Sequence, residues 1–346
     1  MRGDGRSQRF LRACRRRPVD RTPVWFMRQA GRYLPEYRRM RRRHGILEIC
    51  KDPELSARAT LLPVERLGVD AAILFADIML PLEPAGVRFR LVEGLGPVVE
   101  SPIRSLDDVE GLRPVKPERD LPYVLESIRR VKGRLAGMVP LIGFSAAPFT
   151  LAAYLVEGRP SRDFWAVKGL MYSQPGLWHA LMKRLAGMVV EYMRAQVAAG
   201  VDALQLFDSW AGCLSPADYE EHVLPYTRDI FRSLRPLGVP MIYFSTGTAG
   251  HLDLIRTLGA DVVGIDWRVR IDDAWDALGD GVAVQGNLDP AALLADFEVV
   301  RARAMDIIDR VGGRPGHIFN LGHGVLPNTP VENLRRLVDL VHDATG

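Results

Sequence analysis

Eight short apolar runs, separated by segments in which apolar residues recur with helical spacing, constrain the fold of this chain most strongly. Each run has the length of a strand and is followed within three residues by a polar or charged residue. Strands that alternate with helices predict a parallel sheet, and eight such units predict an α/β fold of the closed (β/α)8 (TIM) barrel type. The runs are Val24–Met27, Ala71–Phe75, Val139–Phe144, Ala203–Phe207, Pro240–Phe244, Val262–Ile265, Val282–Gln285 and His317–Asn320.

The same alternation argues for one domain. A chain of 346 residues can bury a large core, and α/β barrels reach this size as one unit. No linker divides the sequence, so we expect a single barrel over residues 1–346, with an N-terminal helical extension around Phe10 and a hairpin within residues 83–101. The main helices expected between strands cover residues 54–67, 123–135, 148–156, 164–171, 177–199, 215–234, 251–258, 271–278, 291–311 and 331–341.

Cysteine content and hydropathy indicate the compartment. Cys14, Cys50 and Cys213 are far apart and form no Cys-x-x-Cys pair, which argues against a disulfide framework and against a zinc site built from cysteines. No apolar run reaches the length of a membrane span, and nothing at the N-terminus resembles a secretory signal. We therefore expect a cytoplasmic protein that does not act in a membrane.

Positive charge is concentrated in the first 43 residues. They include fifteen arginines and no lysine against three acidic residues, a net charge of +12, whereas the rest of the chain has −8. Such a block can mark an arm that binds nucleic acid. However, it runs through the apolar run at Val24 into the fold, and residues 38–43 have the pattern of a solvated helical face. A substrate with many negative charges fits better than nucleic acid.

Polar residues at the ends of the apolar runs form the candidate site. In a (β/α)8 barrel the carboxyl ends of all strands meet on one rim, where active-site residues lie. We therefore expect the active site on this rim. The residues at these positions are Arg28, Arg32, Asp77, Ser145, Asp208, Ser209, Ser245, Thr246, Asp266, Asn287 and His323.

Arg28 and Arg32 are of the residue type that binds carboxylates. They follow an apolar run, and each guanidinium presents a planar fork of N–H donors that matches a carboxylate or phosphate. Ion pairing with acidic neighbours on the surface is the alternative interpretation. We favour ligand binding, because Gly31 between them lets a ligand or the backbone approach closely.

Asp77 follows a fully apolar run, so its carboxylate needs hydrogen-bond donors or a role in binding. An ion pair with Arg28 or Arg32 that only supports the rim is an equally good explanation.

The other candidate side chains give weaker signals. His323 lies between two glycines that leave room for a ligand, although a lone histidine is more often structural. Ser209 is outside the Gly-x-Ser-x-Gly context of a nucleophile, so binding or structural hydrogen bonding is the better interpretation. Tyr154 lies on an expected helix and either packs there or points its hydroxyl inward.

Five stretches of the chain together resemble the uroporphyrinogen decarboxylase family. They occur in the family's order and span nearly the whole chain, and the first is specific. They read Arg28-Gln-Ala-Gly-Arg-Tyr-Leu-Pro-Glu-Tyr37, Gly143-Phe-Ser-Ala-Ala-Pro-Phe-Thr-Leu, Gln205-Leu-Phe-Asp-Ser-Trp-Ala-Gly, Gly286-Asn-Leu-Asp-Pro and Asn320-Leu-Gly-His-Gly. The resemblance implies a (β/α)8 homodimer that decarboxylates the four acetate side chains of uroporphyrinogen III to give coproporphyrinogen III in haem biosynthesis, without a cofactor.

The resemblance also implies roles for matching residues. Asp77 would face the four pyrrole N–H groups at the centre of the macrocycle, and the proton donor would be Arg28 or His323, a choice that the sequence leaves open. Tyr37 stands where other members often have Phe. The implied catalytic residues are Asp77, Arg28 and His323. The implied substrate-binding residues are Arg28, Gln29, Ala30, Gly31, Arg32, Asp77, Tyr154, Ser209 and His323.

Two other functions fit the sequence less well than decarboxylation. Zinc-dependent methyltransferases resemble the same barrel, but they have His-x-Cys after a middle strand and a second late cysteine. Here the stretch reads Phe244-Ser-Thr-Gly247 and no cysteine follows Cys213, so that zinc site cannot be built. A non-catalytic binder of tetrapyrroles or nucleic acid would use the arginine block but would leave Asp77 and His323 unexplained.

Overall fold

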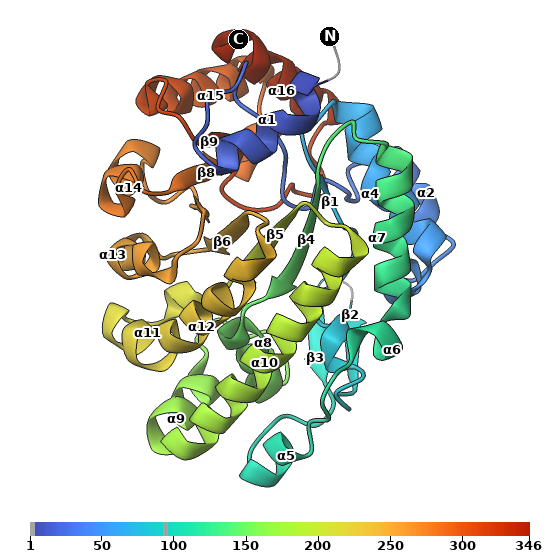
Figure 1. The fold of residues 1–346 in the computed structure, drawn as a ribbon, viewed down its shortest axis with the longest axis vertical. Coiled ribbons are helices and arrows are strands. Elements are labelled where there is room, and N and C mark those ends of the chain that lie inside the picture. Colours follow the sequence, from blue (N-terminus) through green and yellow to red (C-terminus); the bar gives the residue numbers. More distant parts are fainter. Residues whose placement is uncertain (1–3, 93, 95) are drawn as a thin grey trace.

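Seven of the eight apolar runs form strands of one parallel sheet in the computed structural model, which describes residues 4–92, 94 and 96–346. The sheet curls, and helices surround it on the outside (Figure 1). Most strand residues are buried, as expected when one face meets helices and the other the interior. In sheet order the strands are β1 (Ala72–Ile73), β4 (Leu141–Ala146), β5 (Ala203–Asp208), β6 (Met241–Ser245), β7 (Val262–Gly264), β8 (Ala283–Leu288) and β9 (His317–Leu321).

Helices follow or precede nearly every strand. The α-helices are α1 (Asp4–Cys14), α2 (Pro35–Arg41), α3 (Ile46–Lys51), α4 (Pro53–Leu67), α5 (Leu106–Glu110), α6 (Pro117–Asp120), α7 (Pro122–Leu135), α8 (Pro148–Glu157), α9 (Trp165–Ser173), α10 (Pro175–Ala199), α11 (Pro216–His222), α12 (Leu224–Leu234), α13 (Leu252–Ile255), α14 (Ile271–Leu278), α15 (Phe297–Val311) and α16 (Val331–Thr345). Short 3-10 helices are η1 (Leu80–Leu82), η2 (Ala211–Cys213), η3 (Arg235–Leu237), η4 (Ala249–His251), η5 (Arg256–Leu258) and η6 (Pro290–Leu294).

The expected strand at Val24–Met27 is only an isolated parallel bridge between Val24 and Phe319. The run nevertheless lies between β9 and β1: the Phe319 N–H donates to the Pro23 carbonyl (2.9 Å), and the Asp70 N–H donates to the Val24 carbonyl (2.7 Å). Pro23 has no N–H to donate, and the chain turns after four residues, so a regular ladder does not develop.

Other expectations are confirmed or corrected. The hairpin is confirmed as antiparallel β2 (Phe89–Val92) and β3 (Gly96–Val99). The expected helix over 215–234 is divided at Val223, because Pro225 opens a new helix there. The expected helix over 291–311 is likewise divided, and α15 begins only after Asp296. All three cysteines are free thiols. Among the described residues, no helix combines the length and apolar character needed to cross a bilayer.

Just before β1, the buried carboxylate of Asp70 connects the first and last helices. The two ends of the chain lie near each other in Figure 1. Asp70 accepts hydrogen bonds from Arg9 in α1 (2.5 Å), from the Val24 N–H (2.8 Å) and from His342 in α16 (2.7 Å). Arg9, 2% exposed, also binds Asp20 through two N–H groups. Such a buried charge is stable only while all its partners are present.

A second buried carboxylate lies at the end of β5. Asp208 accepts hydrogen bonds from the hydroxyls of Thr150 in α8 (2.9 Å) and Tyr243 in β6 (3.1 Å), and the Tyr243 hydroxyl is 3.0 Å from that of Tyr219 in α11. Burial raises the pKa of Asp208 to about 6, although the two hydroxyl donors oppose this shift. No cation pairs with Asp208 among the described residues, so its charged form is costly.

The raised pKa predicts a pH-dependent effect of Asp208→Asn. Between pH 3.8 and pH 6 the folded protein retains a proton that the unfolded chain has released, so wild type loses stability as the pH rises through this window. The variant has no such group. We expect its free energy of unfolding to rise relative to wild type by roughly 2 kcal/mol between pH 4 and pH 7. Urea denaturation of both proteins over this range measures the difference; a difference independent of pH would contradict the account.

Candidate active site

Arg28 stands where the first apolar run ends, in a left-handed backbone conformation (φ 56°) that residues other than glycine rarely adopt. The run is anchored there, since Met27 donates its N–H to Oδ1 of Asn320 (3.2 Å) and accepts the Val325 N–H (2.9 Å). The exposed Arg28 side chain lies against Gly324: a Cβ atom at 324 would be 2.4 Å from Cδ and 2.6 Å from Cγ of Arg28. Only glycine at 324 therefore leaves room for Arg28.

Asp77 lies in the loop after β1 and is half-buried. Its Oδ1 accepts the N–H of Met79 (2.8 Å), and Oδ2 has no hydrogen-bond partner among the described residues. Burial raises the pKa of Asp77, while the Met79 N–H and the charge of Arg28 lower it. The structure shows no ion pair between Asp77 and Arg28, although the two are close enough to interact electrostatically. One carboxylate oxygen is therefore available to a ligand.

His323, on the loop after β9, is held in one tautomer. Its Nδ1 accepts the N–H of Gly324 (2.7 Å), which places the ring hydrogen on Nε2. Burial, followed by the charges of Arg28 and Arg268, lowers the pKa of His323 to about 4. The imidazole is therefore neutral at pH 7 and donates a hydrogen bond from Nε2. This argues against His323 as the proton donor, because so little imidazolium is present.

Tyr154 belongs to the same site. Its ring, on α8, packs edge-on against Trp210 with 6.0 Å between ring centroids. Burial raises the pKa of Tyr154, and the charges of Asp77 and Arg28 act on it in opposite directions, which places it near both. Ser209, beside Trp210, is half-buried; its carbonyl accepts the Thr246 hydroxyl (2.8 Å), and its own hydroxyl has no partner in the described part of the chain.

The segment between the two predicted arginines is mainly structural. The Gln29 side chain is buried: its Oε1 accepts the Phe26 N–H (3.1 Å), and its Nε2 donates to the Ala71 carbonyl (3.0 Å). It therefore ties the first run to β1 and faces away from solvent. Ala30 and Gly31 are half-buried, and Arg32 is exposed. Any ligand contact of Gln29, Ala30 and Gly31 thus comes from the backbone or the small side chain.

Several other rim residues support loops. Ser145 donates to the carbonyl of Ala146 (3.1 Å), and the hydroxyls of Ser245 and Thr248 are 2.6 Å apart. Together with the buried Asp208, these residues are satisfied within the protein and face no free space.

Asp266 and Asn287 fix the loop that follows β7. Asp266 accepts the N–H groups of Gly247 (2.6 Å) and Arg268 (2.9 Å). Asn287, in β8, donates to the carbonyls of Asp266 (2.8 Å) and Val269 (2.7 Å). The loop thus has little freedom to move.

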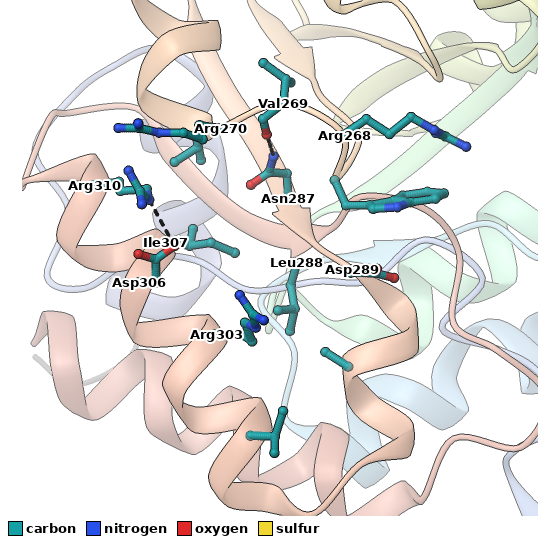
Figure 2. A pocket seen from close by; sticks show the side chains of 14 residues that line it. Arg268, Val269, Arg270, Asn287, Leu288, Asp289, Arg303, Asp306, Ile307 and Arg310 are labelled. Atoms are coloured by element: carbon teal, nitrogen blue, oxygen red, sulfur yellow. Dashed lines mark hydrogen bonds and ion pairs between the residues drawn. The ribbon is translucent and has the colours of Figure 1, made fainter.

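A hollow of about 640 Å³ opens beside this loop, between β8 and α15 (Figure 2). The predicted site residues other than Asn287 do not line it. Its charged walls are formed by Arg268, Arg270, Asp289, Arg303, Asp306 and Arg310. Trp267 borders the hollow and also contacts His323, with 6.4 Å between ring centroids. In the described ranges no group of three or more His, Cys, Asp or Glu side chains is placed to bind a metal ion.

Sequence reasoning missed Trp210, Trp267 and Arg268. Trp210 and Trp267 each directly follow a residue that had been selected, Ser209 and Asp266. An aromatic residue just beyond the end of a strand is ambiguous, because it packs into the core as often as it lines a site. Arg268 gave a usable signal, since it follows a strand end at the distance at which arginine can reach the rim.

Known proteins are similar to this chain over nearly its whole length. The family model described as uroporphyrinogen decarboxylase (URO-D) matches residues 6–344. The chain is 52% identical over 337 residues to a uroporphyrinogen decarboxylase of Carboxydothermus hydrogenoformans, covering 97% of this chain and 96% of that protein. It is 54% identical over 340 residues to one of Roseiflexus sp., covering 97% and 98%.

Solved structures of different proteins share the fold. A methyltransferase from Methanosarcina mazei superposes with a TM-score of 0.81 at 21% identity, covering 98% of this chain and 99% of that one. A B12-independent methionine synthase from Shewanella sp. superposes with a TM-score of 0.58 at 11% identity, covering 87% and 90%. At such identities the likeness concerns the fold alone.

The contact between Arg28 and Gly324 predicts a rescue. Gly324→Ala forces a Cβ into the Arg28 side chain, so we expect it to lower the free energy of unfolding by about 1–3 kcal/mol. Arg28→Ala in the same chain removes Cγ and Cδ, and should recover most of this loss. Gly322→Ala is the control, because its Cβ would meet the Trp267 backbone nitrogen at 2.4 Å. Equal effects of Arg28→Ala in both backgrounds, measured by urea denaturation, would show that Arg28 is not the obstacle.

Proposed function

The chain belongs to the uroporphyrinogen decarboxylase family, and from this premise we propose that it converts uroporphyrinogen III to coproporphyrinogen III. The reaction is that of a carboxy-lyase of tetrapyrrole biosynthesis: four acetate side chains each lose CO2 and become methyl groups. The observation that carries the proposal is Asp77, a half-buried carboxylate with one oxygen unpaired, within the electrostatic reach of Arg28 and Tyr154.

The substrate supplies its own electron sink. A proton added to a pyrrole carbon next to the acetate-bearing carbon makes the ring cationic. The bond between the methylene and the carboxylate then breaks, CO2 leaves, and its electron pair forms an exocyclic double bond that neutralises the ring. A proton added to the methylene gives the methyl group, and loss of the first proton restores the pyrrole. Each acetate thus consumes one proton, and we propose that no cofactor takes part.

Asp77 serves this reaction as a fixed anion. We propose that its unpaired Oδ2 accepts the pyrrole N–H groups at the centre of the macrocycle and stabilises the ring while it is cationic. A carboxylate held by the backbone N–H of Met79 needs no reorganisation when that charge develops. Burial strengthens the interaction, because little water competes for the charge.

The remaining residues orient the carboxylates of the substrate. Arg28 and Arg32 would bind them through their guanidinium forks, aided by the segment Gln29–Gly31, and Tyr154 and Ser209 would contact the macrocycle. His323, neutral at pH 7, would donate its Nε2–H to a carboxylate. Of the two candidate proton donors, this leaves Arg28, whose charge acts on Asp77.

Three further features belong to this proposal. The run Val24–Met27 completes the ring as an eighth strand, giving one closed (β/α)8 barrel over residues 1–346 with the active site at the carboxyl ends of its strands. Two copies form a homodimer, as the resemblance implies, and light scattering of the purified chain tests this. The protein acts in the cytoplasm, in keeping with its free thiols.

One assay tests the function. Purified protein is dialysed against a chelator and incubated anaerobically with uroporphyrinogen III, and the products are oxidised and separated by the number of carboxylates. We expect porphyrins with seven, six, five and finally four carboxylates. Unchanged substrate in the dialysed and undialysed protein would overturn the function, whereas decarboxylation that returns only with added zinc would overturn the proposal that no cofactor takes part.

A substitution at Asp77 separates catalysis from binding. A group that stabilises a developing cation acts mainly in the transition state, so Asp77→Asn should lower kcat by roughly a hundredfold or more while substrate still binds. Asp77→Glu retains the charge and should keep more activity than Asn if the longer side chain fits. Single-turnover decarboxylation measures the rate of the chemical step, and a direct binding titration measures the affinity for the substrate. Full rate at saturation with weakened binding would make Asp77 a docking residue only.

A further inference from the structure

The loop after β7 presents an arginine in a fixed orientation. Arg268 places its guanidinium carbon 4.1 Å from the centroid of the Trp267 ring and donates from Nη1 to Oδ2 of Asp266 (2.5 Å). Asp266 is only 4% exposed, and Asn287 and Gly247 hold the loop through the hydrogen bonds described above. Stacking and one ion pair therefore orient this guanidinium before any ligand arrives.

Most of the Arg268 fork is available for binding. The side chain is 51% exposed, and its Nε–H and Nη2 hydrogens have no partner among the described residues. A guanidinium that uses one nitrogen in an ion pair can still bind a carboxylate by donating two parallel hydrogen bonds from its other nitrogens. Asp266 balances its charge only in part, because that carboxylate also accepts two backbone N–H groups.

Arg268 lies beside the candidate site. The loop packs directly against the chain next to His323: a Cβ at Gly322 would be 2.4 Å from the Trp267 nitrogen. The Trp267 ring meets the His323 ring edge-on, and Arg28 lies against Gly324 on the other side of the histidine. The charges of Arg28 and Arg268 both act on His323. The histidine is thus flanked by two arginines, one from each neighbouring loop.

We propose that Arg268 binds a carboxylate side chain of the tetrapyrrole, on the side of His323 opposite to Arg28. The inference rests on the proposed function. Uroporphyrinogen has eight carboxylates, four on acetates and four on propionates, which is more than Arg28 and Arg32 can bind. Arg268 is a positioning residue in this scheme: it sets which edge of the macrocycle lies against His323, and it takes no part in bond breaking.

The same loop offers a matched control. Arg270 is two residues away and similarly exposed, but it pairs with Asp272 and Asp273. Figure 2 shows its side chain pointing to the opposite side of the loop from that of Arg268. Removing the charge of Arg270 therefore changes the net charge of the protein equally without removing the donor next to His323.

The test compares Arg268→Gln, Arg268→Lys and Arg270→Gln in steady-state decarboxylation of uroporphyrinogen III at two salt concentrations. We expect Arg268→Gln to raise KM by roughly 10- to 100-fold, as for the loss of a charged hydrogen bond, with kcat within about threefold of wild type. Arg268→Lys should have a lower KM than Arg268→Gln, because lysine keeps the positive charge but lacks the planar fork of N–H donors. High salt should reduce the difference in KM between Arg268→Gln and wild type, because salt screens the charge of Arg268. Arg270→Gln should match wild type.

Two results would overturn the inference. One is an Arg268→Gln enzyme whose KM equals that of wild type. The other is a loss of kcat and thermal stability together with unchanged KM, which would mean that Arg268 only neutralises Asp266. Wild-type protein that fails to decarboxylate uroporphyrinogen overturns the function itself, so the two failures are distinguishable. Binding of coproporphyrinogen, which retains only propionates, identifies the partner: weakened binding in Arg268→Gln indicates a propionate, and unchanged binding beside a raised KM indicates an acetate.

Discussion

The buried carboxylate of Asp70 joins four segments that are distant in the sequence. It accepts hydrogen bonds from Arg9 in the first helix, from the backbone of Val24 and from His342 in the last helix, and it lies two residues before β1. Breaking a buried pair of this kind costs about 3–5 kcal/mol, because the charge that remains has no water to replace its partner. The packing of the first and last helices against the Val24 run and the start of β1 therefore depends on Asp70.

The consequence of this anchor appears at the other end of the same run. Val24 is fixed at the base by Asp70, and three residues later Met27 is fixed by Asn320 and Val325. Arg28 follows at once, in a strained conformation that the contacts on either side impose. A short segment without a regular ladder thus has a defined position at both ends. The backbone of Arg28 is therefore fixed in position, although its side chain is long and exposed.

The sequence predicted those parts of the fold that depend on local pattern. Seven strands and most helices follow from runs of apolar residues. Arg28, Asp77 and His323 are among the residues that follow such runs, and the family resemblance singled them out. The break at Val223 and the bridge at Val24 depend on proline chemistry and on partners far along the chain, which periodicity does not contain. The position of Arg268 just after a strand end could have been noted from the sequence, but its stacking on Trp267 and its closeness to His323 exist only after the loop has folded.

The ionisation of His323 could not be predicted either, and it links the two sides of the site. The imidazole is neutral at pH 7 because burial and two guanidinium groups oppose a third positive charge. A carboxylate bound to Arg28 or Arg268 would cancel one of these charges and raise the pKa of His323 toward its ordinary value. If these arginines bind the substrate as proposed, they also set how strongly the histidine donates its hydrogen. The charge of Arg28 also lowers the pKa of Asp77, so in the proposed function the carboxylate that would stabilise the pyrrole ring and the arginine that would position the substrate are coupled electrostatically.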